Sequence, residues 1–82
     1  MAERIYKYPI EITGMQSIRA YEGATPIAFQ LQGGIPMVWC IVDDNAKEAD
    51  LWLYVYGTGQ KTGNHAYVGT IQKDGFVWHL FF

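Results

Sequence analysis

One short segment of the sequence concentrates residues that can bind a ligand. Residues 57–65 are Gly-Thr-Gly-Gln-Lys-Thr-Gly-Asn-His. Glycines allow successive backbone N–H groups to point to one side and form a nest for an anion. The neighbouring side chains can donate further hydrogen bonds to a phosphate or a sugar hydroxyl. The candidate ligand-binding residues of this segment are Thr58, Gly59, Lys61, Thr62, Asn64 and His65.

This segment has two possible interpretations, and neither of them is a P-loop. It is not a P-loop, because the Gly-Lys-Thr triplet is absent and no helical pattern follows it. It is either a ligand-contacting loop or a flexible hairpin loop between two strands.

Aromatic residues and a second histidine lie close to this segment in the predicted strands. Tyr54, Tyr56 and Tyr67 flank it and could stack against a nucleobase. The alternative is that these rings pack on the face of a sheet. His79, between Trp78 and Leu80, is either a ligand contact or a core or interface histidine satisfied by one hydrogen bond. We include Tyr56, Tyr67 and His79 among the candidate ligand-binding residues.

The other reactive residues do not form a catalytic or metal-binding pattern. The one serine, Ser17, lies in a strand-like run without the strand-turn-helix elbow of serine hydrolases. Cys40 lies in an apolar run, where burial would raise the pKa of the thiol and hide the sulfur. One cysteine and two histidines without close spacing do not make a zinc site, and Asp43-Asp44 lacks the spacing of a calcium loop. We expect no enzyme activity, no metal and no cofactor.

The composition indicates one folded domain over residues 1–82. Half of the residues are hydrophobic and 17% are charged, which excludes a disordered chain. The net charge of -2 argues against binding to a nucleic-acid polymer, which requires a basic surface. The N-terminus lacks the pattern of a secretory signal, and no apolar run is long enough to span a membrane as a helix. We therefore expect a soluble cytoplasmic protein with a buried, reduced Cys40.

Isoleucine, valine, threonine and aromatic residues dominate the segments between the glycines and prolines, which favours strands. We predict an all-β fold, a single small antiparallel sandwich or barrel of about seven short strands. The predicted strands are residues 4–8, 16–21, 27–32, 37–43, 51–56, 67–72 and 76–81. Gly33-Gly34 and Asp74-Gly75 predict tight hairpins between the third and fourth and between the sixth and seventh strands. Residues 44–50 are predicted to form a solvated loop.

Several predicted strands are apolar on both faces. In the last strand, Trp78 and Leu80 alternate with Val77, His79 and Phe81. A single sheet with one solvated face would alternate apolar and polar residues instead. Either two sheets curl into a closed barrel with capped ends, or the outer face of one sheet meets a partner subunit. With three tryptophans, six tyrosines and four phenylalanines to cover in so small a chain, we expect a homo-oligomer.

Blocks along nearly the whole chain resemble a small protein family of bacteriophages and prophages. The blocks are Ile5-Tyr6-Lys7-Tyr8 with Ile10 and Ile12, Gly23-Ala24, residues 30–34, residues 39–43, Tyr56-Gly57-Thr58-Gly59, residues 67–72 and residues 77–81. The resemblance implies a phage accessory protein of the host cytoplasm, and it assigns no functional residue.

Two functions fit the residues together with this resemblance. The first is a non-enzymatic anti-defence protein that sequesters a small phosphorylated nucleotide signal in pockets shared between subunits. In this hypothesis the glycine segment holds phosphate and the aromatic rings stack the base. The alternative is a protein-protein inhibitor that uses an exposed apolar and acidic surface to block a host defence protein, such as a CRISPR or other immune protein. An enzyme ranks third.

Overall fold

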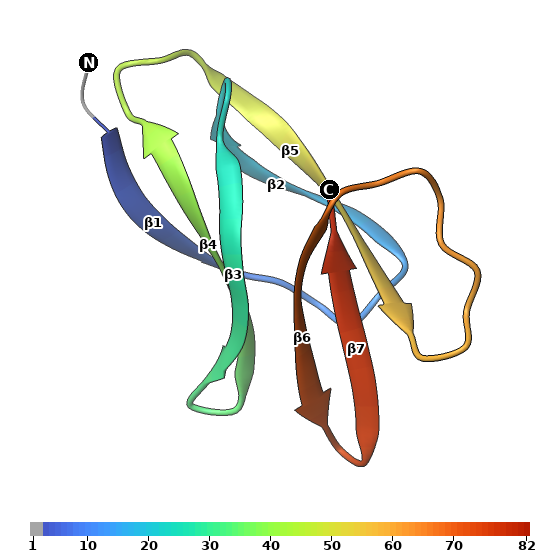
Figure 1. Cartoon of the computed structure of the whole chain (residues 1–82). Coiled ribbons are helices and arrows are strands. Elements are labelled where there is room, and N and C mark those ends of the chain that lie inside the picture. Colours follow the sequence, from blue (N-terminus) through green and yellow to red (C-terminus); the bar gives the residue numbers. More distant parts are fainter. Residues whose placement is uncertain (1–2) are drawn as a thin grey trace.

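The β-branched and aromatic segments form seven strands in two antiparallel sheets, which confirms the predicted all-β fold. The computed structural model describes residues 3–82. The three-stranded sheet has the order β1-β4-β3 and the four-stranded sheet the order β2-β5-β7-β6 (Figure 1). The strands are β1 (Glu3–Pro9), β2 (Met15–Tyr21), β3 (Thr25–Gln32), β4 (Ile35–Asp43), β5 (Glu48–Gly57), β6 (Tyr67–Lys73) and β7 (Phe76–Phe81). Within residues 3–82 no helix is long and apolar enough to cross a membrane.

Both predicted hairpins are present. Gly33 and Gly34 have φ angles of 57° and 79°, and Asp74 and Gly75 have φ angles of 55° and 81°. Two consecutive residues with positive φ are the signature of a type I′ turn, whose twist matches that of paired strands. These turns make β3 and β4, and β6 and β7, antiparallel neighbours.

The predicted loop over residues 44–50 is partly wrong, because its last three residues belong to β5. Glu48, Ala49 and Asp50 pair with Tyr21, Ala20 and Arg19 of β2. The Arg19 guanidinium lies 3.4 Å from the Asp50 carboxylate across this pair. Pairing with β2 therefore extends the strand into a polar stretch that has no strand pattern of its own.

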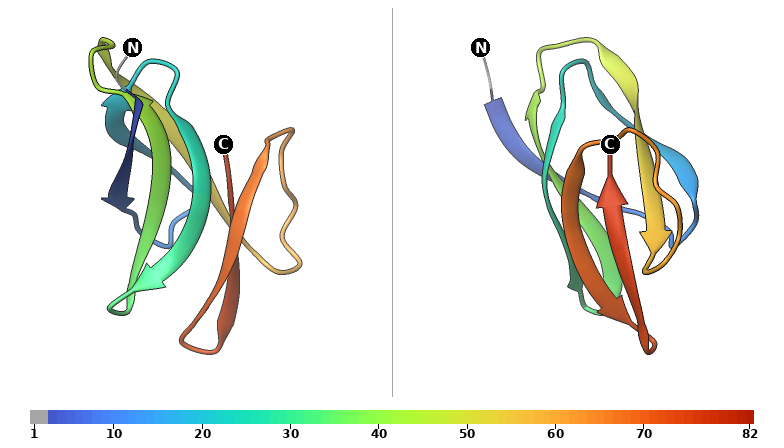
Figure 2. Two further views of the ribbon diagram at one scale, coloured as in Figure 1. Left: turned by 60° about the vertical axis from the view of Figure 1, so that its left-hand side comes forward. Right: turned by 45° about the vertical axis from the view of Figure 1, so that its right-hand side comes forward.

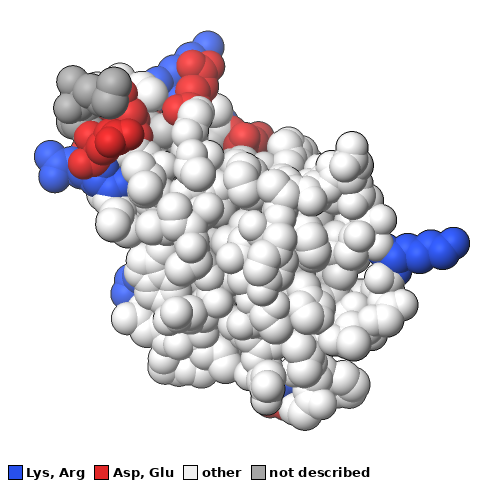
Figure 3. Space-filling model, in the orientation of Figure 1, with Lys and Arg blue, Asp and Glu red and all other residues white. Residues whose placement is uncertain are grey.

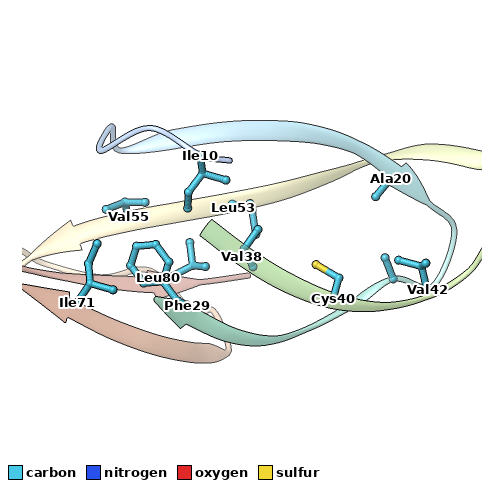
Figure 4. Close-up of a cluster of buried hydrophobic side chains, with 11 residues drawn as sticks. Ile10, Ala20, Phe29, Val38, Cys40, Val42, Leu53, Val55, Ile71 and Leu80 are labelled. Carbon is cyan, nitrogen blue, oxygen red and sulfur yellow. The ribbon is translucent and has the colours of Figure 1, made fainter. Parts of the chain in front are cut away.

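The core lies between the two sheets and consists of apolar side chains from both (Figure 4). In β4, Val38, Cys40 and Val42 are fully buried, while Trp39 and Ile41 between them lie half-buried on the outer face. This alternation is the period of a strand with one face in the core. Leu53 and Leu80 contribute from the opposite sheet. The two layers form a small sandwich (Figure 2).

β3 and β6, each at the edge of its sheet, approach closely where a glycine removes the side chain between them. A Cβ atom at Gly69 would lie 3.1 Å from Cβ of Phe29 and 3.2 Å from its backbone nitrogen. Gly69 also follows a register irregularity in β6. The absence of a side chain here allows Phe29 to enter the core at the junction of the two sheets.

We expect Gly69→Ala to lower the free energy of unfolding by about 1 to 3 kcal/mol, because the added methyl group meets backbone that can move only if β3 and β6 separate. Urea unfolding measures the loss. Gly14→Ala is the matched control, since a Cβ there meets nothing within 4 Å and Gly14 lacks a positive φ. Equal stability of the two variants would contradict the close approach.

Burial raises the pKa of the Cys40 thiol to about 11. In an unfolded chain a thiol titrates near pH 8.5, so between about pH 9 and 11 the folded chain binds more protons than the unfolded one. The free energy of unfolding must then fall as the pH rises through this window. We expect urea unfolding to show this fall in the wild type and a smaller one in Cys40→Ala. Identical pH profiles of the two proteins would show that the thiol does not contribute.

Candidate functional site

The outer face of the four-stranded sheet carries a group of aromatic side chains that the core does not use. Leu53 and Val55 of β5 are buried, so the alternate residues of that strand point to the outside. We call the outward-facing rings of Trp52, Tyr54, Tyr56, Tyr67 and Phe81 the aromatic face. Trp52 is 49% exposed and Tyr67 is 59% exposed, although both are large and apolar.

The register of the strands places these rings next to one another. Phe81 of β7 lies opposite Tyr54 of β5 on one side and Tyr67 of β6 on the other. The ring centroids of Phe81 and Tyr56 are 5.6 Å apart, and those of Phe81 and Tyr67 are 5.5 Å apart, both in edge-to-face geometry. This geometry is the favourable one for aromatic pairs, so Phe81 fixes the positions of its neighbours.

His79 joins the sheet to the loop that follows β5. Its Nε2 atom lies 2.9 Å from the hydroxyl of Thr58, and its Nδ1 atom lies 2.9 Å from the hydroxyl of Thr70. A hydroxyl can donate or accept, so each ring nitrogen has a matching partner in either neutral tautomer. Tyr67 extends the chain through a hydrogen bond with Thr70. His79 therefore positions Thr58, and both of its nitrogens are occupied.

The loop between β5 and β6 lies against the aromatic face. The His65 ring stacks on Tyr54 with a centroid distance of 3.7 Å and an interplanar angle of 12°. The Gly63 N–H donates to the Tyr56 hydroxyl at 3.4 Å. The interpretation of this segment as a hairpin loop is wrong, because β7 lies between β5 and β6 in the sheet.

The candidate residues fall into two groups. Tyr56, Thr58, His65, Tyr67 and His79 come together on or beside the aromatic face. Gly59, Lys61, Thr62 and Asn64 lie in the exposed outer part of the loop. Among residues 3–82, the side chains of Lys61, Thr62 and Asn64 have no hydrogen-bond partner or ion pair. The proposed anion nest stays a prediction.

Trp52, Thr70 and Phe81 also belong to this site, although they were not among the predicted ligand-binding residues. Alternation in β5 places Trp52 on the same face as Tyr54 and Tyr56, and alternation in β7 places Phe81 on the same face as His79. These signals were present in the sequence. The sequence does not show which strands share a sheet. The outward-facing residues of β5 and β7 form one surface only because β5 pairs with β7.

Charged side chains gather at one end of the molecule, near the start of β1 and the β4–β5 turn, and much of the surface seen in Figure 3 is uncharged. At that end the Arg4 guanidinium lies 2.6 Å from the Asp44 carboxylate. The Tyr6 hydroxyl donates to the same carboxylate at 3.1 Å, and this hydrogen bond raises the pKa of Tyr6. Beside the aromatic face, the Arg19–Asp50 ion pair lies next to the pair formed by Ser17 and Trp52.

Residues 3–82 form no enclosed cavity and no cluster of three metal-ligating side chains. The site is thus a surface of rings with a loop against it.

A family model described as a domain of unknown function (DUF7352) matches residues 1–82. No curated protein and no solved structure matches the sequence.

Proposed function

We propose that this chain, which belongs over residues 1–82 to the family described as a domain of unknown function (DUF7352), is a non-enzymatic protein that binds a protein partner through its aromatic face. The observation that carries the proposal is the exposure of the face. Trp52 and Tyr67 stay about half exposed although the fold has a complete apolar core between its sheets.

The chemistry of the face supports a protein as the partner. Tyrosine, tryptophan and phenylalanine are enriched in protein interfaces, and tryptophan and tyrosine often carry the largest share of binding energy. Rings that are already held by neighbours lose little conformational freedom on binding. Here Phe81 holds Tyr56 and Tyr67, and His65 stacks on Tyr54. The Arg19–Asp50 pair beside Trp52 supplies a polar rim.

The sequence blocks that resemble a phage and prophage family support a bacterial protein as this partner. We propose that the chain acts in the host cytoplasm as an anti-defence inhibitor and that the partner is an immune protein of the bacterium. An inhibitor of this kind acts by covering a surface of its target, so the proposal requires no catalytic residue.

The proposal is tested with tagged protein expressed in the bacterial host and purified under native conditions. We expect one host protein to copurify in constant ratio with the wild type and to be lost from Trp52→Ala and Tyr67→Ala. Ile35→Ala is the matched control, because Ile35 is 50% exposed and lies in the other sheet. Retention of the same host protein by Trp52→Ala and Tyr67→Ala would contradict the proposed face.

A second candidate function is the sequestration of a phosphorylated nucleotide. The observation that favours it is the outer part of the loop, where Lys61, Thr62 and Asn64 are exposed. They lie beyond Thr58 and His65, which contact the sheet. A ligand held there would be enclosed only if a second subunit covered the loop.

Lys61→Ala tests nucleotide sequestration separately from the binding of a protein partner. The substitution should leave the free energy of unfolding within about 0.5 kcal/mol, because Lys61 is exposed and unpaired within the described residues. If the loop binds phosphate, loss of the charged hydrogen bond should weaken nucleotide binding by roughly 10- to 150-fold. Titration with linear and cyclic nucleotides measures the affinity. Wild-type protein that binds none of them below millimolar concentration would exclude nucleotide sequestration and leave the protein-binding proposal intact.

A further inference from the structure

The free edge of β1 is a second surface with defined chemistry. β1 lies at the end of the three-stranded sheet and pairs with β4 on one side. The opposite end of that sheet, β3, lies against β6. Among residues 3–82 no strand pairs with the other side of β1, so this side presents unpaired backbone groups that can bind another strand.

The hydrogen bonds of the ladder show which residues present those groups. The Ile10 N–H donates to the Pro36 carbonyl at 3.0 Å, in continuation of the register that places Pro9 opposite Met37. Hydrogen-bonded and non-hydrogen-bonded pairs alternate along an antiparallel ladder. Tyr6 and Tyr8 therefore bond to β4, as Ile10 does. The backbone groups of Glu3, Ile5 and Lys7 point to the free edge.

We propose that two copies of the chain pair antiparallel along this edge, with Ile5 opposite Ile5 of the second copy. The two three-stranded sheets then form one continuous sheet. In this register Glu3 of each copy lies opposite Lys7 of the other, and each opposed pair exchanges two backbone hydrogen bonds. Opposite charges directly across an antiparallel pair are stabilising.

Other registers of the same edge are less complementary. Pairing centred on Arg4 or on Lys7 brings like charges opposite one another, which is destabilising. Pairing centred on Tyr6 places Pro9, which has no N–H, opposite Glu3. β2, at the end of the four-stranded sheet, has Arg19 as its one charged residue and offers no complementary pair.

The exposed side chain of Ile5 also favours this pairing. Ile5 is 62% exposed and lies beside Ile41 on the outer face of the sheet. Pairing brings the two copies of Ile5 together and covers apolar surface that a single copy leaves in water. A lysine on an edge strand normally opposes such pairing. Here Glu3 lies at the spacing that neutralises Lys7 of the second copy, once the Lys7 ammonium leaves Gln32 of β3, to which it donates at 2.6 Å.

The test uses charge reversal in the full chain, with sedimentation equilibrium and native mass spectrometry as measurements. We expect the wild type to dimerise. Glu3→Lys places lysines opposite lysines, and Lys7→Glu places glutamates opposite glutamates. Each should therefore weaken the dimer by about 10- to 100-fold. An equimolar mixture of the two variants should form a heterodimer, because each then finds its complement.

Recovery in the mixture shows that both variants are folded, so a loss of dimer in each alone reports the edge and not misfolding. A wild type that sediments only as the 9.3 kDa chain at micromolar concentration would overturn the proposal. So would single variants that dimerise as the wild type does, or a mixture that stays monomeric. Trp52→Ala, which is on the other sheet, should leave the dimer unchanged, so the two proposals can fail separately.

Discussion

Phe29→Ala will lower the free energy of unfolding by about 3 to 5 kcal/mol, the usual cost of removing a fully buried ring. Phe29 is 2% exposed and lies where β3 approaches Gly69 of β6, so it fills the junction of the two sheets. Small domains have a total stability of about 5 to 15 kcal/mol. The variant should therefore unfold at a much lower urea concentration than the wild type.

Ile27→Ala is the control for this prediction, since Ile27 lies in the same strand and is 45% exposed. Ile27→Ala should lower the free energy of unfolding by much less than Phe29→Ala does, because about half of the Ile27 side chain is already in water. A loss of less than about 1 kcal/mol for Phe29→Ala would contradict the assignment of Phe29 to the core.

Removal of Phe81 and Phe82 should cost about 3 to 5 kcal/mol and disorder the aromatic face. The backbone of Phe82 exchanges two hydrogen bonds with Ala66, at 2.8 and 2.7 Å, and so ties the loop to β7. The Phe81 ring contacts Tyr56 and Tyr67 edge-on. The truncated chain loses the hydrogen bonds to Ala66 and the ring contacts of Phe81. The midpoint of thermal unfolding measures the loss of stability.

Phe82→Ala distinguishes the contribution of the Phe82 ring to stability from that of the Phe82 backbone hydrogen bonds. It keeps the hydrogen bonds to Ala66 and removes a ring that is exposed to solvent, so we expect a smaller shift in the thermal midpoint. An unchanged midpoint for the truncated chain would show that the last two residues do not hold the loop.

Much of the fold could be predicted because its local signals are strong. Two-residue turns at Gly33-Gly34 and Asp74-Gly75 determine both hairpins and the register of the residues that flank each turn. Counting back from Asp74-Gly75 places Thr70 opposite His79. The hydrogen bond between His79 and Thr70 could therefore be predicted from the sequence.

Long-range pairing could not be predicted in the same way. Nothing local shows that β7 lies between β5 and β6, because strand order depends on how complete faces pack in the folded chain. The contact of Thr58 with His79 requires this pairing, which places Tyr56 opposite His79. Residues 48–50 became strand for the same reason, since β2 supplies a partner for a polar segment.

The central claim is that the aromatic face is the functional surface, and photocrosslinking in the bacterial host tests it most directly. A benzophenone amino acid replaces Ser17, which is exposed and lies opposite Trp52, in one protein and the exposed Ile35 in another. Crosslinks of one discrete host protein to position 17, with none to position 35, are the result we predict. Crosslinks of a host protein to position 35 with none to position 17 would contradict the claim.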